Sequence, residues 1–191
     1  MKKHWIQQNM TDEHLQDRTK TIADISPYEC NLTQLVPIIG REKYFEMVGD
    51  VYGPQWTAAT EIIPRALEGI QELSQVGDVH VVTARRAWEV KNTTDWLQAK
   101  GFSPYVKSII YLDDPRYSNT QDVAGSRKVG LALHLGAQTL IDDDFRHMPN
   151  KPVEGLEGVL FGLAKRVNIP SHIVIARDWV EVLDYARKKA A

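Results

Sequence analysis

Residues 126–144 read SRKVGLALHLGAQTLIDDD, and this stretch decides the fold class. Its first part spaces apolar residues along one face of a helix, with Ser126 placed as the N-terminal cap and Gly136 as the stop. The short apolar run at 139–141 then predicts a buried strand. Three carboxylates, Asp142 to Asp144, follow the strand directly. A helix leading into a strand that ends on polar residues is typical of an α/β protein whose ligand site lies at the strand ends.

The same alternation of helix and strand extends along the chain on both sides of this stretch. Further helices are predicted at 63–75, 87–101 and 179–189, and further strands at 79–83, 108–112, 158–162 and 172–176. We therefore predict an α/β core over residues 61–191, with one parallel sheet covered by helices on both faces. Residues 1–60 lack the alternation. They predict a helix within 1–20, followed by short helical pieces interrupted by proline and glycine.

Composition narrows the class of protein. The chain has 191 residues and a formal net charge of −2, so one domain with a small subdomain is expected and no basic field favours nucleic acid. A single cysteine, Cys30, excludes an intramolecular disulfide and lacks the spacing of a zinc site. No apolar run reaches the length of a membrane span and no signal peptide is evident, so we expect a cytoplasmic protein with no membrane contact.

The strand at 79–83 ends on a candidate phosphate contact. The Thr83 hydroxyl and the backbone amides that follow it could bind a phosphate oxygen, with Arg85 or Arg86 as a nearby cation. The same hydroxyl could instead cap the next helix. Both interpretations fit these residues. His80, inside the apolar strand, is expected to be structural.

Lys128 and the acidic run form the second candidate. Lys128 stands at a helix start, where a cation is unfavourable unless an anion is also present; a solvated lysine is the alternative, and Arg127 could take the role. Asp142 and Asp143 could coordinate a hard cation such as Mg²⁺, although an acidic strand end can equally be a helix cap or a solvated turn.

Together, Thr83 after an apolar strand, Lys128 fourteen positions before Asp142, and LIDDD at the next strand end resemble three motifs of the haloacid dehalogenase (HAD) superfamily. They resemble its second, third and fourth motifs. Residues 62–85 and the C-terminal stretch from GVLFG onward resemble the 5'(3')-deoxyribonucleotidase family within it. The resemblance covers roughly residues 20–188 and implies a HAD-like Rossmannoid three-layer sandwich with a small helical cap, the cap lying within residues 1–60.

The resemblance also implies roles for individual residues. Thr83, with the backbone of Ala84 and Arg85, would bind phosphate, and Lys128 would neutralise the phosphate and the nucleophile. Asp142 and Asp143 would hold Mg²⁺, whereas Asp144 falls at a variable position. The implied activity is magnesium-dependent hydrolysis of a phosphomonoester, with a nucleoside monophosphate or another small phosphate ester as substrate.

The first motif of the family, an apolar strand ending in Asp-x-Asp, has no counterpart in the N-terminal region. Gln7 and Asn9 have its spacing but are not carboxylates, and Asp24 lies in a segment that resembles the cap. The expected strand would end at or before Met1, which indicates a start placed too late, a truncated product or a loss of catalysis. The nucleophile is therefore unassigned.

Loss of that strand has two expected consequences. Because the strand is central in the HAD sheet, its neighbours would need rearrangement, a partner strand or an unpaired gap. The chain is expected to be a weak or inactive phosphatase of the 5'-nucleotidase class. The alternative is a non-catalytic module that binds a nucleotide, a phosphate or a protein partner, which could be a second copy of the chain.

Overall fold

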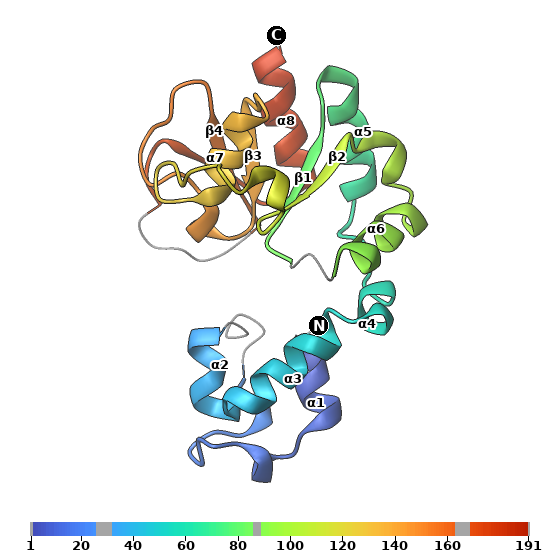
Figure 1. The fold of residues 1–191 in the computed structure, drawn as a ribbon, viewed down its shortest axis with the longest axis vertical. Helices are drawn as coiled ribbons and strands as arrows, with labels where there is room; N and C mark the ends of the chain where they lie inside the picture. Colours follow the sequence, from blue (N-terminus) through green and yellow to red (C-terminus); the bar gives the residue numbers. More distant parts are fainter. Residues whose placement is uncertain (1, 26–31, 86–88, 163–168, 191) are drawn as a thin grey trace. The chain divides into compact units, whose positions relative to one another are not determined.

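A computed structural model describes residues 2–25, 32–85, 89–162 and 169–190. Cys30, Arg86 and part of the helix expected at 87–101 lie outside these ranges. The chain divides into two compact units, Met1–Glu61 with Lys91–Trp96, and Ile62–Val90 with Leu97–Ala191 (Figure 1). We call them the helical unit and the α/β unit. The division after residue 61 lies one residue from the boundary expected from sequence, and one later helix contributes to both units.

The helical unit consists of short helices. They are α1 (Lys2–Asn9), the 3₁₀ turns η1 (Asp12–His14) and η2 (Ile22–Asp24), α2 (Leu32–Ile39), α3 (Arg41–Val51) and α4 (Pro54–Ala58). The helix expected within residues 1–20 is α1, which ends at Asn9. Thr11 explains the stop: its N–H donates to Nδ1 of His14 at 2.9 Å, and its hydroxyl lies 3.0 Å from the same nitrogen. Such local bonds compete with helix continuation.

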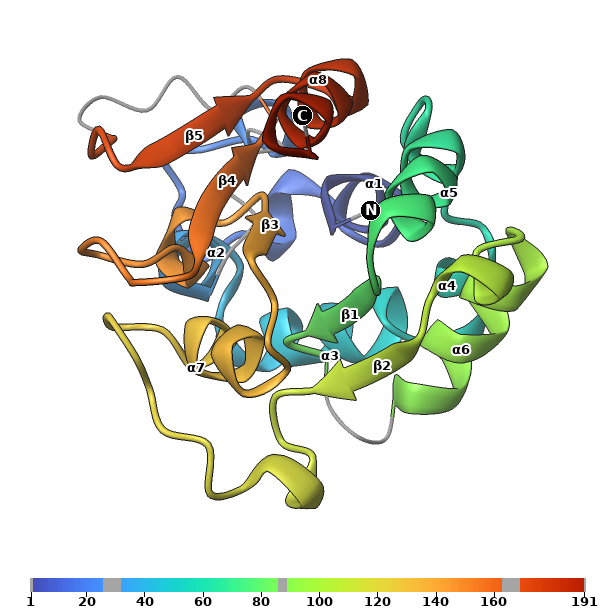
Figure 2. The same ribbon diagram turned by 90° about the horizontal axis from the view of Figure 1, so that it is seen from above.

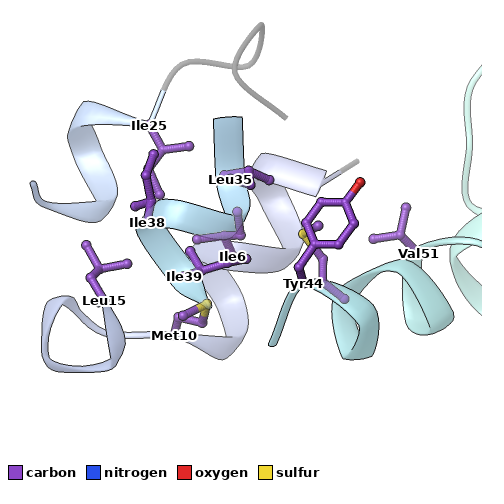
Figure 3. Packing of buried hydrophobic residues seen from close by; sticks show 10 residues of the cluster. Ile6, Met10, Leu15, Ile25, Leu35, Ile38, Ile39, Tyr44 and Val51 are labelled. Carbon is purple, nitrogen blue, oxygen red and sulfur yellow. The ribbon is translucent and has the colours of Figure 1, made fainter. Parts of the chain in front are cut away.

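The helical unit has its own hydrophobic core (Figure 3). Apolar side chains from α1, α2, α3 and the turns between them converge there, and nine are labelled in the figure: Ile6, Met10, Leu15, Ile25, Leu35, Ile38, Ile39, Tyr44 and Val51. Ile6, Ile25 and Leu35 are fully buried. The unit therefore carries the main requirement for independent stability, an apolar interior built from its own segments.

The α/β unit alternates strands and helices. Its strands are β1 (His80–Thr83), β2 (Ser108–Tyr111), β3 (Thr139–Asp142), β4 (Glu157–Phe161) and β5 (Ile173–Ala176). Its helices and 3₁₀ turns are α5 (Ala66–Val76), α6 (Val90–Ala99, shared with the helical unit), η4 (Ser103–Tyr105), η5 (Pro115–Tyr117), α7 (Arg127–His134), η6 (Phe145–His147) and α8 (Trp179–Ala190). Every strand pair is parallel, which confirms the α/β class. No helix in the described ranges combines the length and apolar content needed to cross a membrane.

The parallel sheet is divided, which is the unpaired gap that the sequence gives as one outcome of a missing central strand. β1 pairs with β2, and β3, β4 and β5 form a second sheet in that order. Figures 1 and 2 both show β1 and β3 as the neighbouring members of the two sheets, and no strand in the described residues lies between them. Figure 2 also shows α7 on one side of the strands and α5 with α8 on the other.

The stretch that predicted the fold class forms the expected elements. The Ser126 hydroxyl accepts from the N–H of Val129 at 3.5 Å and caps α7. After α7, Gly136 has a φ of 69°, a left-handed conformation that glycine adopts without strain. β3 follows at Thr139 and pairs with β4 along its whole length. The acidic run consequently begins at the last residue of β3.

Candidate functional site

A buried ion pair joins the start of α7 to the end of β3. The Lys128 ammonium lies 2.5 Å from Oδ2 of Asp142, and the two side chains are 9% and 7% exposed. Sequence reasoning placed both residues in one site, and the structure brings them together. Removing two charges from water is costly, and an apolar pair of similar volume is often as stable or more so. The pair is therefore a candidate for function rather than for stability alone.

Asp142 has two further partners on the segment that follows it. His147 Nδ1 lies 3.2 Å from Oδ1, and the backbone N–H of Asp144 donates to the same oxygen at 2.8 Å. Burial opposes ionisation of the carboxyl, but the His147 hydrogen bond and the Lys128 charge outweigh it and hold the pKa of Asp142 below its usual value. The site thus keeps a charged carboxylate in a largely buried position.

His147 is the residue that sequence reasoning missed. It lies in η6, five positions after Asp142, where the chain turns back toward the end of β3. Its backbone also takes part, because the Ser126 hydroxyl donates to the His147 carbonyl at 2.9 Å. The available signal was a histidine just beyond an acidic strand end, and that pattern alone does not tell which way the ring points.

Lys128 retains hydrogen-bonding capacity beyond its carboxylate partner. An ammonium has three N–H donors, and Asp142 is its one ion-pair partner in the described part of the chain. The residue is the second of α7, where the unpaired amides and the helix dipole also favour negative charge. An anion that reached this position would meet a cation already oriented by a neighbouring group.

Arg127, the alternative cation, is engaged in the loop that precedes α7. Its guanidinium donates to three backbone carbonyls of the segment before α7, those of Leu112, Tyr117 and Thr120, each at 2.9 Å. The five donors of a guanidinium in a rigid fork suit this task. Arg127 therefore fixes the loop that leads into α7, and Lys128 is left as the site cation.

Thr83 lies where the sequence predicts, at the carboxyl end of β1. Its side-chain oxygen accepts from the N–H of Arg85 at 3.1 Å, a local turn contact of the kind that the capping alternative requires. Ala84 is exposed and Arg85 is partly buried. No described hydrogen bond joins Thr83 to the Lys128–Asp142 pair, so the phosphate role of residues 83–85 stays a prediction.

The described acidic residues do not by themselves make a magnesium site. No group of three or more histidine, cysteine, aspartate or glutamate side chains in the described ranges is arranged to hold a metal ion. Asp142 is engaged by Lys128, and Asp143 is exposed. Asp144 caps η6 and accepts from the Arg146 guanidinium, which lowers its pKa to about 2. Because Mg²⁺ is usually six-coordinate, the proposed ligands Asp142 and Asp143 would need other oxygen donors.

None of the sequence-based substitutes for the first motif occupies a strand end. Gln7 and Asn9 lie in helix α1, so their two-residue spacing does not place them on one strand face. Asp24 lies in η2, where its carboxylate accepts from both the N–H and the hydroxyl of Thr21 at 2.8 Å. All three belong to the helical unit. The nucleophile stays unassigned.

Comparison with known proteins adds no assignment. Models of known protein families do not match the chain, and a search of curated proteins found no match.

Proposed function

We propose that the α/β unit binds the phosphate group of a small phosphomonoester of the nucleoside monophosphate class. The observation that carries the proposal is the buried Lys128–Asp142 pair at the carboxyl end of β3. In parallel α/β sheets this edge is the usual position of ligands. A phosphate oxygen would accept the remaining ammonium protons of Lys128, and Asp142 would hold the ammonium in place.

The resemblance to 5'(3')-deoxyribonucleotidases supports the same class of ligand. In this proposal Thr83 and the amides of Ala84 and Arg85 contact phosphate oxygens from the end of β1. Mg²⁺, held through Asp142, Asp143 and additional oxygen donors, would supply charge neutralisation when bound. The order of these residues along the chain is what the resemblance rests on.

Hydrolysis by this chain is proposed to be weak or absent. The phosphatase reaction of the family needs a carboxylate to attack phosphorus, and neither the sequence nor the described residues supply a candidate. Asp142 is a poor one, because its charge is compensated by Lys128 and its oxygens already accept three hydrogen bonds. Removal of the attacking group eliminates the covalent route, whereas binding through Lys128 would persist.

Calorimetry tests this proposal. The purified chain is titrated with deoxynucleoside monophosphates and with inorganic phosphate, with and without Mg²⁺. We expect saturable binding that Lys128→Gln weakens by at least about tenfold, the worth of one charge-assisted hydrogen bond. Lys91→Gln is the matched control, because Lys91 forms an ion pair that is 82% exposed on the lysine side.

Two results would contradict it. Absence of binding under both conditions, or equal affinity of the Lys128 and Lys91 variants, would remove the phosphate proposal. A phosphate-release assay tests the second part: turnover at about 1 s⁻¹ or faster would show that the chain has a nucleophile that we have not identified.

A non-catalytic interaction module is the second candidate. The divided sheet favours this candidate, because the strands in the middle of a parallel α/β sheet normally have a paired strand on each side.

A further inference from the structure

His147 has no role in the proposed phosphate binding, yet it contacts the buried ion pair directly. Its Nδ1 lies 3.2 Å from Oδ1 of Asp142, and the Lys128 ammonium lies 2.5 Å from Oδ2 of the same carboxylate. The His147 side chain is 25% exposed. One carboxylate thus holds an ammonium on one oxygen and, on the other, an imidazole ring that is partly open to solvent.

The contact with Asp142 fixes which nitrogen of the neutral His147 ring carries the proton. Asp142 is paired with an ammonium, so it is a carboxylate that accepts hydrogen bonds and donates none. Nδ1 must therefore donate, and Nε2 keeps its lone pair. In the described part of the chain, Nε2 has no hydrogen-bond partner. An imidazole nitrogen in this state can act as a nucleophile.

Two other histidines have the opposite arrangement. Nδ1 of His14 accepts from the N–H of Thr11 at 2.9 Å, so in the neutral ring the proton lies on Nε2. Nε2 of His172 lies 3.0 Å from the carbonyl oxygen of Pro149, which can only accept, so this nitrogen also carries the proton. The free lone pair on Nε2 is therefore specific to the surroundings of His147.

Backbone contacts hold His147 in position. Its N–H donates to the Asp144 carbonyl at 2.9 Å within η6, and its own carbonyl accepts from the Ser126 hydroxyl at 2.9 Å. The Asp144 carboxylate is paired with the Arg146 guanidinium, so its charge is partly compensated. His147 is thus anchored at its backbone and at Nδ1, which fixes the position of a reacting group before a ligand arrives.

We propose that His147 is a nucleophile that accepts a phosphoryl group from an acyl phosphate bound at Lys128. Nε2 forms a bond to phosphorus, the bond from phosphorus to the bridging oxygen breaks, and the carboxylate leaves with the electron pair. The ring gains a positive charge and keeps its Nδ1 proton, which faces the Asp142 carboxylate. The Lys128 ammonium stabilises the charge on the phosphoryl oxygens. This step rests on the proposed phosphate binding at Lys128.

The ionised state of Asp142 favours an acyl phosphate over a phosphomonoester as the donor. The alkoxide of a monoester needs a proton in order to leave, and an ionised Asp142 has none to give. The carboxylate of an acyl phosphate is a stable anion and leaves without a proton. A monoester would therefore bind without transferring its phosphoryl group, which agrees with the weak or absent hydrolysis of the proposed function.

Acetyl phosphate tests the proposal on the full chain. The protein is incubated with it in mildly alkaline buffer and digested, and phosphate on each histidine is quantified by mass spectrometry without acid. We expect His147 to be labelled at least about tenfold faster than His14, the effect of one charge-assisted hydrogen bond on the position of the proton. Absence of label on His147, equal labelling of the two histidines, or phosphate on an aspartate instead would overturn the proposal.

His147→Asn is the matched variant, because its amide can still donate to Asp142 but offers no nucleophilic lone pair. We expect the label at this position to be lost without transfer to another residue, whereas His14→Asn should be labelled on His147 like the parent chain. Lys128→Gln should slow the labelling at least about tenfold. Circular dichroism melts check that the variants fold. An unchanged total label in folded His147→Asn, or an unchanged rate in folded Lys128→Gln, would overturn the proposal.

Nuclear magnetic resonance of the ring nitrogens keeps the test decisive even if the variants fail to fold. In the ¹⁵N-labelled parent chain, Nε2 should be unprotonated in His147 and protonated in His14, and a protonated Nε2 in neutral His147 would overturn the proposal. Calorimetry with inorganic phosphate separates this inference from the proposed function. Phosphate binding without label on His147 would refute the nucleophile alone, whereas absence of both would refute the phosphate site as well.

Discussion

The substitution Lys128→Met tests the energetics of the buried ion pair directly. It removes the ammonium, keeps most of the apolar stem, and leaves the Asp142 carboxylate at 7% side-chain exposure without its cation. Removing one member of a buried pair typically costs about 3 to 5 kcal/mol. Asp142 would still accept from His147 and from the N–H of Asp144. We therefore expect the lower end, a loss of about 3 kcal/mol in the free energy of unfolding.

The reciprocal change, Asp142→Leu, should cost more. Lys128 has no second ion-pair partner in the described residues, so its ammonium would be left buried and unpaired. We expect a loss of about 5 kcal/mol. The double variant Lys128→Met with Asp142→Leu removes both charges and fills the space with apolar groups. Its free energy of unfolding should lie within about 1 kcal/mol of that of the parent chain, so the coupling energy between the two positions is large.

Urea unfolding at pH 7, followed by circular dichroism and extrapolated linearly to water, measures these values. Lys91→Met is the control, since the Lys91–Asp95 pair is 82% and 56% exposed and such pairs contribute about 0.3 to 0.5 kcal/mol. The reasoning is refuted if the Lys128 and Asp142 single variants behave like this control, or if the double variant is as unstable as the sum of the two.

Three further predictions concern the surroundings of the site. Arg127→Lys replaces a guanidinium that donates to three carbonyls at 2.9 Å by a single ammonium. We expect the free energy of unfolding in urea to fall by about 2 kcal/mol and proteolysis within residues 113–125 to become faster. Unchanged cleavage would contradict the role of Arg127 in holding this loop. Gly130→Ala would place a Cβ at 2.0 Å from the Gln121 carbonyl oxygen, so the backbone must move. The free energy of unfolding should fall by about 1 to 3 kcal/mol. Gly49→Ala is the control, because a Cβ at Gly49 meets nothing within 4 Å. The pKa of Asp142 in the folded chain lies below its ordinary value of 3.8. Its ionisation therefore contributes stability that is present above pH 3.8 and is lost as pH falls through the folded pKa. Below pH 3.8 the free energy of unfolding should therefore fall less steeply with decreasing pH in Asp142→Asn than in the parent chain. Parallel stability curves for the two proteins would contradict the lowered pKa of Asp142.

The elements around the acidic run could be predicted because their signals are local. Ser126 and Gly136 bound a helix by capping chemistry that involves only neighbouring residues. The strand after it is a short apolar run, and parallel pairing follows from the alternation of helix and strand. His80 was expected to be structural, and its Nδ1 lies 2.7 Å from the Ser108 hydroxyl across the β1–β2 pair.

The parts that sequence reasoning missed depend on side-chain direction or on distant partners. Gln7 and Asn9 have the spacing of a strand motif, yet α1 is a helix and their side chains do not share a strand face. His147 and Arg127 take their roles from loops whose path the sequence does not specify. The division of the sheet was foreseen as one of three outcomes of a missing central strand, but choosing among them required the strand pairing itself.

The buried ion pair and the open edge are properties of one strand, β3, and stability alone explains neither of them. Asp142 ends this strand inside a charged pair that apolar residues could replace, and Thr139 with Ile141 line its unpaired side. If the double variant at Lys128 and Asp142 folds as well as the parent but no longer binds phosphate, the pair is kept for a ligand.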